Sequence, residues 1–149
     1  MKNLHVSLGE QVRFSKTVSE SDVYLFAGIT GDFSVNHVNE EYMKGTIYGK
    51  RIVHGALLIG FVSTTSTMLI ERSVARGTDE TAVSLGYDKI RFLKPVFLGD
   101  TITVTYTVEK IDAAARRSWA KVEIANQHGE LVTVGQHLLK WTPNKPQER

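Results

Sequence analysis

The segment from Gly55 to about Glu71 constrains the fold more than any other part of the chain. Apolar or small residues occupy every side of a helix drawn through it. Other elements usually cover a helix of this kind, because a surface helix needs a polar face. Serines and threonines at residues 63–67 interrupt its apolar run, which favours the core of a soluble domain over a membrane span. We therefore expect one long helix inside the fold.

Segments rich in Val, Ile, Thr and aromatic residues follow this helix, and turn signals separate them. They are Ala82–Phe92, Thr101–Ile111, Trp119–Ala125 and Leu131–Trp141. Residues 101–108 alternate small polar with apolar side chains, as a half-buried antiparallel strand does. A shorter strand is expected near residues 12–18. The pattern predicts an α+β domain in which an antiparallel β-sheet wraps around one long hydrophobic helix.

Two shorter helical elements are expected before the long helix. Ser19 and Asp22 are three residues apart and fit a capping box at a helix start. Gly28 and Gly31 supply stop signals for that helix. Residues 40–44 form at most one helical turn, which ends near a glycine at position 45.

The composition restricts the class of protein. The chain has 149 residues, 42% of them hydrophobic and 23% charged, which indicates one globular domain (residues 1–142) with a polar tail (143–149). The net charge is only +2 and the basic residues are scattered, so no nucleic-acid partner is expected. The absence of cysteine excludes disulfides, a thiolate nucleophile and a cysteine zinc site. The N-terminus lacks the apolar run of a secretory signal, so we expect a cytoplasmic protein without a membrane anchor.

Proton chemistry is suggested by three residues that lie before or at the start of the long helix. Asp32 and His37 are five residues apart in the loop that follows Gly31, and Gly55 lies in the first turn of the long helix. A carboxylate, an imidazole and a helix N-terminus can supply a base, an acid and a site for an oxyanion. The alternative is structural: Gly31 and Asp32 form a turn, His37 begins a helix, and Gly55 allows close packing.

Three motifs in order make the chain similar to a known family. Gly31-Asp32-Phe33-Ser34-Val35-Asn36-His37, Ile52-Val53-His54-Gly55 and the segment from Arg91 to Ile102 resemble the MaoC-like, R-specific enoyl-CoA hydratases. The resemblance extends from about residue 10 to residue 141. It implies a hot-dog fold and the reversible syn addition of water to a trans-2-enoyl-CoA, which gives the (R)-3-hydroxyacyl thioester. It implies no cofactor, because coenzyme A is part of the substrate.

Catalytic roles follow from the resemblance at Asp32, His37 and Gly55. Asp32 is expected to polarise the water, His37 to hold it and deliver a proton to C2, and the Gly55 amide to bind the thioester oxygen. Sequence alone does not separate the roles of the acid and the base. No metal is expected, because no pair of histidines on one helix face accompanies these residues.

Substrate contacts are expected at four further positions. They are Ser63, His54, Arg91 and Lys94. Ser63 matches a pocket serine of the family, although a buried serine often bonds only to its own helix. His54 is expected to pack near the helix entrance instead of reacting. Arg91 and Lys94, with basic residues 50 and 51, can meet phosphates of coenzyme A or lie as solvated charges at a strand edge.

One motif departs from the family pattern. The family usually has Asn-Pro after Gly-Asp-Phe and an aliphatic residue before the histidine, whereas this chain has Ser34, Val35 and Asn36. Proline would stiffen the loop between the carboxylate and the imidazole. The departure therefore questions the rigidity of that loop and the range of substrates.

Assembly and alternative activities complete the predictions. Hot-dog proteins generally pair free strand edges, so we expect a homodimer. The family resemblance also implies that the protein binds an acyl-CoA or an acyl-carrier-protein thioester. An acyl-CoA thioesterase is an alternative, but it would need an acid on the long helix, and residues 55–70 contain none. A non-catalytic acyl-CoA-binding module is the other alternative, and the altered residues 34–36 are the feature that favours it.

Overall fold

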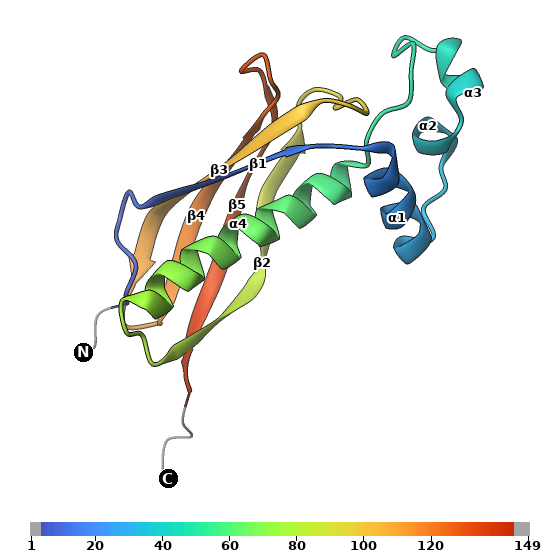
Figure 1. Ribbon diagram of the computed structural model, residues 1–149. Helices are drawn as coiled ribbons and strands as arrows, with labels where there is room; N and C mark the ends of the chain where they lie inside the picture. Colours follow the sequence, from blue (N-terminus) through green and yellow to red (C-terminus); the bar gives the residue numbers. More distant parts are fainter. Residues whose placement is uncertain (1–3, 145–149) are drawn as a thin grey trace.

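A computed structural model describes residues 4–144, in which a five-stranded antiparallel sheet carries one long helix (Figure 1). The strands are β1 (Gln11–Thr17), β2 (Glu80–Phe92), β3 (Thr101–Asp112), β4 (Arg117–Ala125) and β5 (Leu131–Pro143). Their order across the sheet is β1-β3-β4-β5-β2, and every neighbouring pair is antiparallel. The α+β class and all five predicted strands are confirmed.

Alternation along β3 creates one apolar and one polar face of the sheet. Ile102, Val104 and Tyr106 are buried in the same hydrophobic core as the long helix. The threonines between them lie on the other face, where Thr103 Oγ1 lies 2.8 Å from Ser15 Oγ on β1. The period of two in the sequence therefore decides which face receives the helix.

The helices are α1 (Glu20–Thr30), α2 (Val35–Val38), α3 (Glu40–Lys44) and α4 (Gly55–Ala75). The predicted capping box is present: the Asp22 amide donates to Ser19 Oγ, and the Ser19 amide donates to Asp22 Oδ2 at 2.8 Å. Gly31 ends α1 with a φ of 81°, a left-handed conformation that glycine adopts without strain. Gly28 lies inside α1 and is therefore not a stop signal.

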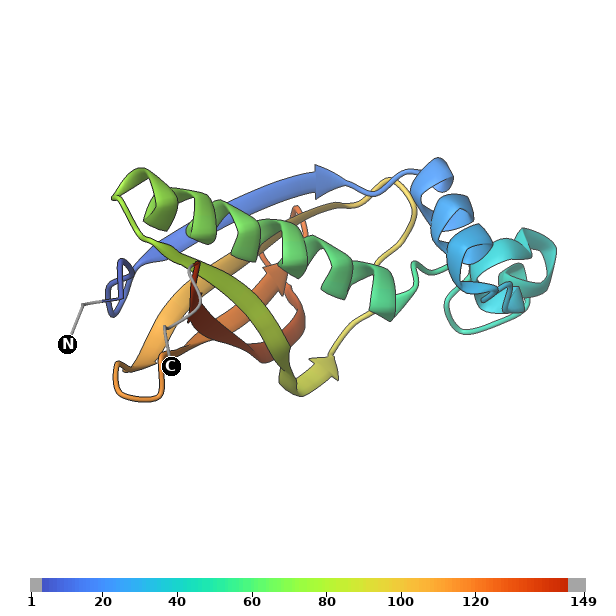
Figure 2. The same cartoon turned by 90° about the horizontal axis from the view of Figure 1, so that it is seen from below.

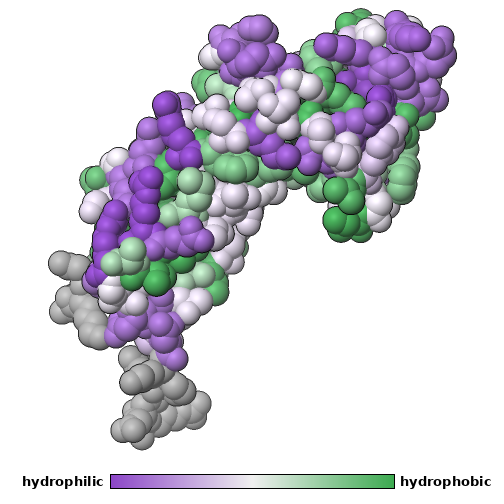
Figure 3. All heavy atoms as spheres, viewed as in Figure 1, coloured by the Kyte–Doolittle hydropathy of each residue, from purple (hydrophilic) through white to green (hydrophobic). Residues whose placement is uncertain are grey.

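The sheet covers one side of α4, which is one turn longer than the sequence predicts (Figure 2). Leu58, Val62 and Leu69 face the core and are buried. The opposite side is exposed and carries small residues: Ala56, Gly60, Ser63, Thr64 and Thr67. Figure 3 shows pale and green residues along the first part of this surface. The expectation that other elements cover every side of this helix is therefore met on the sheet side only, because one sheet does not close around a helix.

Both ends of the described chain lie away from α1–α3 (Figure 1). β5 includes Pro143, the first residue of the predicted polar tail, and residues 145–149 of that tail lie outside the described residues. Within residues 4–144, no helix has both the length and the hydropathy needed to cross a bilayer.

A buried histidine joins three elements in the core. His137 on β5 accepts or donates at both ring nitrogens: Nδ1 lies 2.9 Å from the Tyr106 hydroxyl, and Nε2 lies 2.8 Å from Ser84 Oγ. The Tyr87 ring stacks on the imidazole at a centroid distance of 4.3 Å. Burial lowers the pKa of His137 from 6.5 to about 4. The folded protein therefore holds this side chain neutral at pH 7.

We expect the free energy of unfolding to fall as the pH is lowered from about 6.5 to about 4. In this range His137 is protonated in the unfolded chain but stays neutral in the folded protein. The slope from this group is at most about 1.4 kcal/mol per pH unit. Urea unfolding at pH 7, 6 and 5 measures it. His137→Gln should show a flatter pH dependence, and equal slopes in both proteins would exclude the assignment.

Candidate active site

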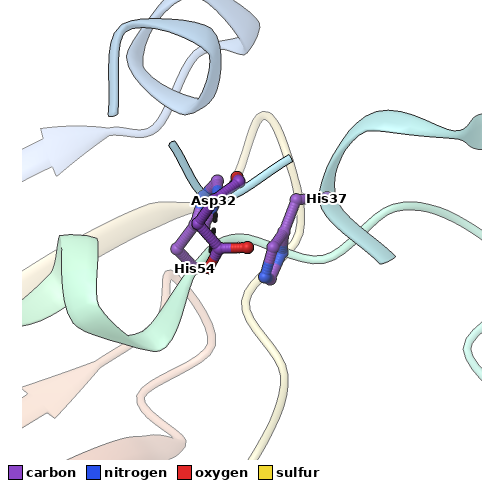
Figure 4. A group of neighbouring side chains, drawn as sticks. All are labelled: Asp32, His37 and His54. Carbon is purple, nitrogen blue, oxygen red and sulfur yellow. Dashed lines mark hydrogen bonds and ion pairs between the residues drawn. The ribbon is translucent and has the colours of Figure 1, made fainter. Parts of the chain in front are cut away.

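Three side chains from separate elements converge at the end of the sheet where α1, α2 and α4 meet. Asp32 follows α1, His37 lies on α2, and His54 immediately precedes α4. Each offers one ligand-type atom, and these atoms lie within 4.8 Å of one another. In Figure 4 the carboxylate of Asp32 points toward the ring of His37. The structure therefore brings together the carboxylate and imidazole that the sequence analysis selected.

Local hydrogen bonds hold Asp32 in its loop. Its Oδ1 accepts from the Ser34 amide at 3.2 Å, and its own amide donates to Thr30 Oγ1 at 3.2 Å. The Asp32 side chain is 51% exposed to solvent, so the carboxylate is open to water and substrate. The loop fixes the backbone and leaves Oδ2 for chemistry.

A backbone carbonyl fixes the tautomer of His37. Its Nδ1 lies 2.8 Å from the Ile52 carbonyl oxygen, which can only accept, so Nδ1 carries the hydrogen. Nε2 then holds the lone pair. Burial is the main cause that moves the pKa of His37 below its usual 6.5, and the neighbouring His54 lowers it further; the Ile52 bond and Asp32 oppose them. At neutral pH the side chain is therefore a base with Nε2 free.

His54 lies behind these two groups and is 2% exposed at its side chain. Its Nε2 lies 3.0 Å from the Asp32 carbonyl oxygen, and its ring stacks on His37 at a centroid distance of 3.7 Å. It is absent from the lining of the neighbouring cavity. The expectation that it packs at the helix entrance matches this position; a direct contact with substrate stays a prediction that its burial does not favour.

A cavity of about 360 Å³ lies beside His37 and reaches the N-terminus of α4. Among its lining residues are Asn36, His37, Gly55, Phe92 and Lys94. The cavity is large enough for a short acyl thioester, and one of its walls carries the catalytic candidate His37.

Gly55 and Phe92 pack closely at the first turn of α4. A Cβ atom at this position would lie 2.7 Å from the Phe92 ring. The side chain of the N-cap, His54, makes no hydrogen bond to the helix. The first amides of a helix have no intrahelical acceptor, so this end of α4 offers N–H groups and a positive dipole to an oxyanion. The packing and oxyanion explanations for this glycine are thus compatible.

The remaining predicted substrate contacts are not all at the cavity. Lys94 lines it, and its ammonium group also pairs with Glu130 at 2.5 Å. Arg91 is exposed outside the lining, and its guanidinium donates to the Ile90 carbonyl. Ser63 is exposed on α4, about two turns from Gly55, and its hydroxyl interacts with Tyr87.

Of the two other basic residues that could contact a phosphate, Arg51 already forms ion pairs within the protein. Arg51 pairs with Glu20 of α1 at 2.5 Å and with Glu40 of α3 at 2.9 Å. Lys50 lies 4.4 Å from the centre of the Phe97 ring. Arg51 therefore joins α1 and α3 to the residues before α4 and is not available for a phosphate. This structural role could not be predicted, because Glu20 and Glu40 lie far from Arg51 along the sequence.

The altered loop residues form bonds of their own. Ser34 Oγ donates to Asn36 Oδ1, the His37 amide donates to the Ser34 carbonyl at 2.9 Å, and the Ile52 amide donates to the Asn36 carbonyl at 3.0 Å. These contacts restrain the segment that proline would otherwise stiffen. The departure from the family pattern thus leaves the loop tied to the residues before α4.

The same three side chains, Asp32, His37 and His54, are of types that bind metals. The Asp32 carbonyl needs a hydrogen on His54 Nε2, and the Ile52 carbonyl needs one on His37 Nδ1. A protonated ring nitrogen cannot ligate a metal. Without breaking these bonds, lone pairs remain at His37 Nε2, at the buried His54 Nδ1 and on the carboxylate, and those of His37 and Asp32 are sufficient for proton transfer.

Two proteins that are similar to this chain are (R)-hydratases. The (R)-specific enoyl-CoA hydratase of Rhodospirillum rubrum is 42% identical over 100 residues, which are 67% of this chain and 64% of that protein. This chain therefore spans somewhat less than two thirds of that relative's length. The solved (R)-hydratase of A. caviae superposes with a TM-score of 0.80 at 26% identity, covering 91% of this chain and 96% of that one.

The fold and the family follow from two further matches. A hot-dog-like protein from Thermanaerovibrio acidaminovorans has a TM-score of 0.66 at 16% identity and covers 93% of this chain and 85% of its own. The predicted hot-dog fold is thus confirmed. Residues 4–130 match the family model described as MaoC like domain. This chain belongs to the MaoC-like dehydratase family.

Proposed function

We propose that this chain catalyses the reversible addition of water to the double bond of a trans-2-enoyl-CoA, which forms an (R)-3-hydroxyacyl-CoA. The observation that carries the proposal is the convergence of Asp32 and His37, since His37 lines a cavity whose lining also includes Gly55, the first residue of α4. Similarity to (R)-specific enoyl-CoA hydratases supports the substrate class.

The fixed tautomer of His37 assigns the proton path in this proposal. Nε2 takes a proton from the water while the water oxygen bonds to C3, and the imidazolium then returns that proton to C2. Asp32 accepts a hydrogen bond from the second O–H of the water, whose hydrogen stays on the hydroxyl at C3, and stabilises the transient imidazolium. One water is consumed and no proton is gained or lost overall. Because donor and nucleophile share one water, both atoms add to the same face.

Negative charge develops on the thioester oxygen when the water attacks C3. In this proposal the Gly55 amide, which lies in the first turn of α4 and lines the cavity, binds that oxygen. Lys94, which lines the cavity, is the proposed contact for a phosphate of coenzyme A or of an acyl-carrier-protein prosthetic group. The chemistry needs no further cofactor. A cytoplasmic location stays a prediction of the sequence.

Crotonyl-CoA tests this function directly. Loss of the enoyl absorbance without free thiol, with (R)-3-hydroxybutyryl-CoA as the product, is the expected result. Release of free thiol would indicate a thioesterase, and binding without any change would indicate a non-catalytic module. A series of longer enoyl thioesters then measures the preferred chain length.

We also propose a homodimer in which β2 pairs with β2 of a second copy. β2 is an edge of the sheet and carries exposed apolar side chains, Val83 at 43% and Leu85 at 48% exposure. An unpaired edge with apolar side chains invites strand pairing. The small residues on the exposed side of α4 would let a second helix approach closely. These two surfaces support a dimer that uses the β2 edge.

Light scattering at micromolar concentration should give twice the chain mass of 16.6 kDa. Leu85→Lys should shift the protein to the monomer, because a charge would then enter the paired edge. Leu8→Lys is the matched control, since Leu8 is 70% exposed and lies at the other side of the sheet, beside β1. A wild-type monomer, or an equal effect of both variants, would contradict the proposed interface.

A further inference from the structure

His54 occupies the N-cap of α4 without serving as a helix cap. Ser, Thr, Asp and Asn are favoured at this position because their side chains accept from the first amides of the helix. The His54 side chain makes no such bond. Its ring instead turns toward the Asp32 loop and α2 (Figure 4). The position is thus used for something other than helix capping.

The contacts of His54 reach every part of the candidate site. Its Nε2–H donates to the Asp32 carbonyl at 3.0 Å, and Nε2 lies 3.9 Å from Asp32 Oδ2. One face of its ring stacks on His37, and Phe26 of α1 contacts the ring at a centroid distance of 4.8 Å. The following residue is Gly55, the first residue of α4. One buried side chain therefore links the carboxylate, the imidazole and the oxyanion end of the helix.

The unpartnered nitrogen of the ring supports the same conclusion. His54 Nδ1 is buried and has no hydrogen-bond partner among the residues that the structure describes. A leucine or phenylalanine would fill the space without burying an unpaired polar atom. Packing alone therefore does not explain a histidine here, whereas the need for an N–H directed at the Asp32 carbonyl does.

We propose that His54 is a positioning residue, which holds the Asp32 loop through its Nε2–H and supports the ring of His37, so that carboxylate and imidazole share one water. This role rests on the proposed function. His54 takes no proton from the substrate in this scheme. The titratable side chains next to His54 are Asp32 and His37, and His54 contributes to the lowered pKa of His37.

His54→Phe and His54→Gln separate the hydrogen bond from packing. Phenylalanine keeps an aromatic ring against His37 but lacks the N–H, whereas the amide of glutamine can reach the Asp32 carbonyl. We expect His54→Phe to lower kcat for crotonyl-CoA about 10- to 100-fold with KM within about twofold, since misplacement of catalytic groups mainly affects the transition state. His54→Gln should recover at least about half of the lost factor on a logarithmic scale.

Two controls exclude a merely structural effect. His137→Gln changes a buried histidine whose polar partners are Tyr106 and Ser84, and it should keep kcat within about twofold. His54→Asn, whose amide is too short to reach the carbonyl, should resemble His54→Phe, so the comparison of Gln with Asn stands even where Phe does not fold. Equal kcat in the wild type and His54→Phe, or equal losses in the Gln and Asn variants, would overturn the proposal.

A measurement without turnover keeps this proposal separate from the proposed function. NMR order parameters of the backbone amides at residues 32–34 should fall from about 0.85 toward 0.6 in His54→Phe and stay high in His54→Gln. Unchanged values in His54→Phe would overturn the positioning role. If the wild type does not hydrate enoyl thioesters but the order parameters respond, the proposed function fails and the role of His54 in holding the loop stands.

Discussion

Asp32→Asn is expected to lower kcat for crotonyl-CoA hydration by at least about 100-fold, with the fold intact. The amide keeps an oxygen that accepts from the Ser34 amide, so the turn survives. It loses the negative charge that in the proposed mechanism orients the water and stabilises the imidazolium of His37. The loss therefore falls on the transition state, and kcat and kcat/KM should drop together.

The matched control is Asp112→Asn at the β3–β4 turn. Asp112 Oδ1 accepts from the Ala115 amide at 2.8 Å, the same kind of turn bond that Asp32 makes, but it lies on a different element from the site. Asp112→Asn should keep kcat within about twofold. Rates are followed by the enoyl absorbance, and unfolding midpoints confirm that both variants fold. Near-normal turnover of Asp32→Asn would contradict the assigned role.

The strands and the helix starts could be read from the sequence because their signals are local. Alternation along residues 101–108, the Ser19–Asp22 box and Gly31 each act within a few residues, and the structure contains all three. Coverage of α4 is not local. Its apolar and small residues predict contact on every side, but a single sheet supplies only one, and the other side of α4 is exposed.

The carboxylate and imidazole were also accessible to sequence analysis, since Asp32 and His37 are close along the chain and match family motifs. The partners that hold them were not. Ile52 fixes the tautomer of His37 through its backbone carbonyl, and Phe92 lies over Gly55 from the end of β2. Every residue has a backbone carbonyl, so the residue type at a position does not predict which carbonyl will bind a histidine. Phe92 belongs to the third motif, but its meeting with Gly55 depends on the tertiary fold.

His37→Ala is expected to lower kcat for crotonyl-CoA by at least about 100-fold, because it removes the group that in the proposed mechanism takes the proton from water and returns it to C2. The variant should still fold, since α2 is short and the imidazole lies at the cavity wall. His128→Ala changes an exposed histidine in the β4–β5 turn and should leave kcat within about twofold. Substantial turnover by His37→Ala would mean that another base acts.

The pH profile of the wild type tests which form of His37 is active. Hydration by a neutral base requires an unprotonated Nε2, so kcat should rise with pH through the pKa of His37 and then stay level. Burial moves that pKa below 6.5, so the midpoint of the rise should lie below pH 6.5. Asp32→Asn should lower the midpoint further, because the nearby carboxylate raises the pKa of His37. A kcat that instead falls as the pH rises through this range would mean that imidazolium is the active form, and that His37 acts first as the acid.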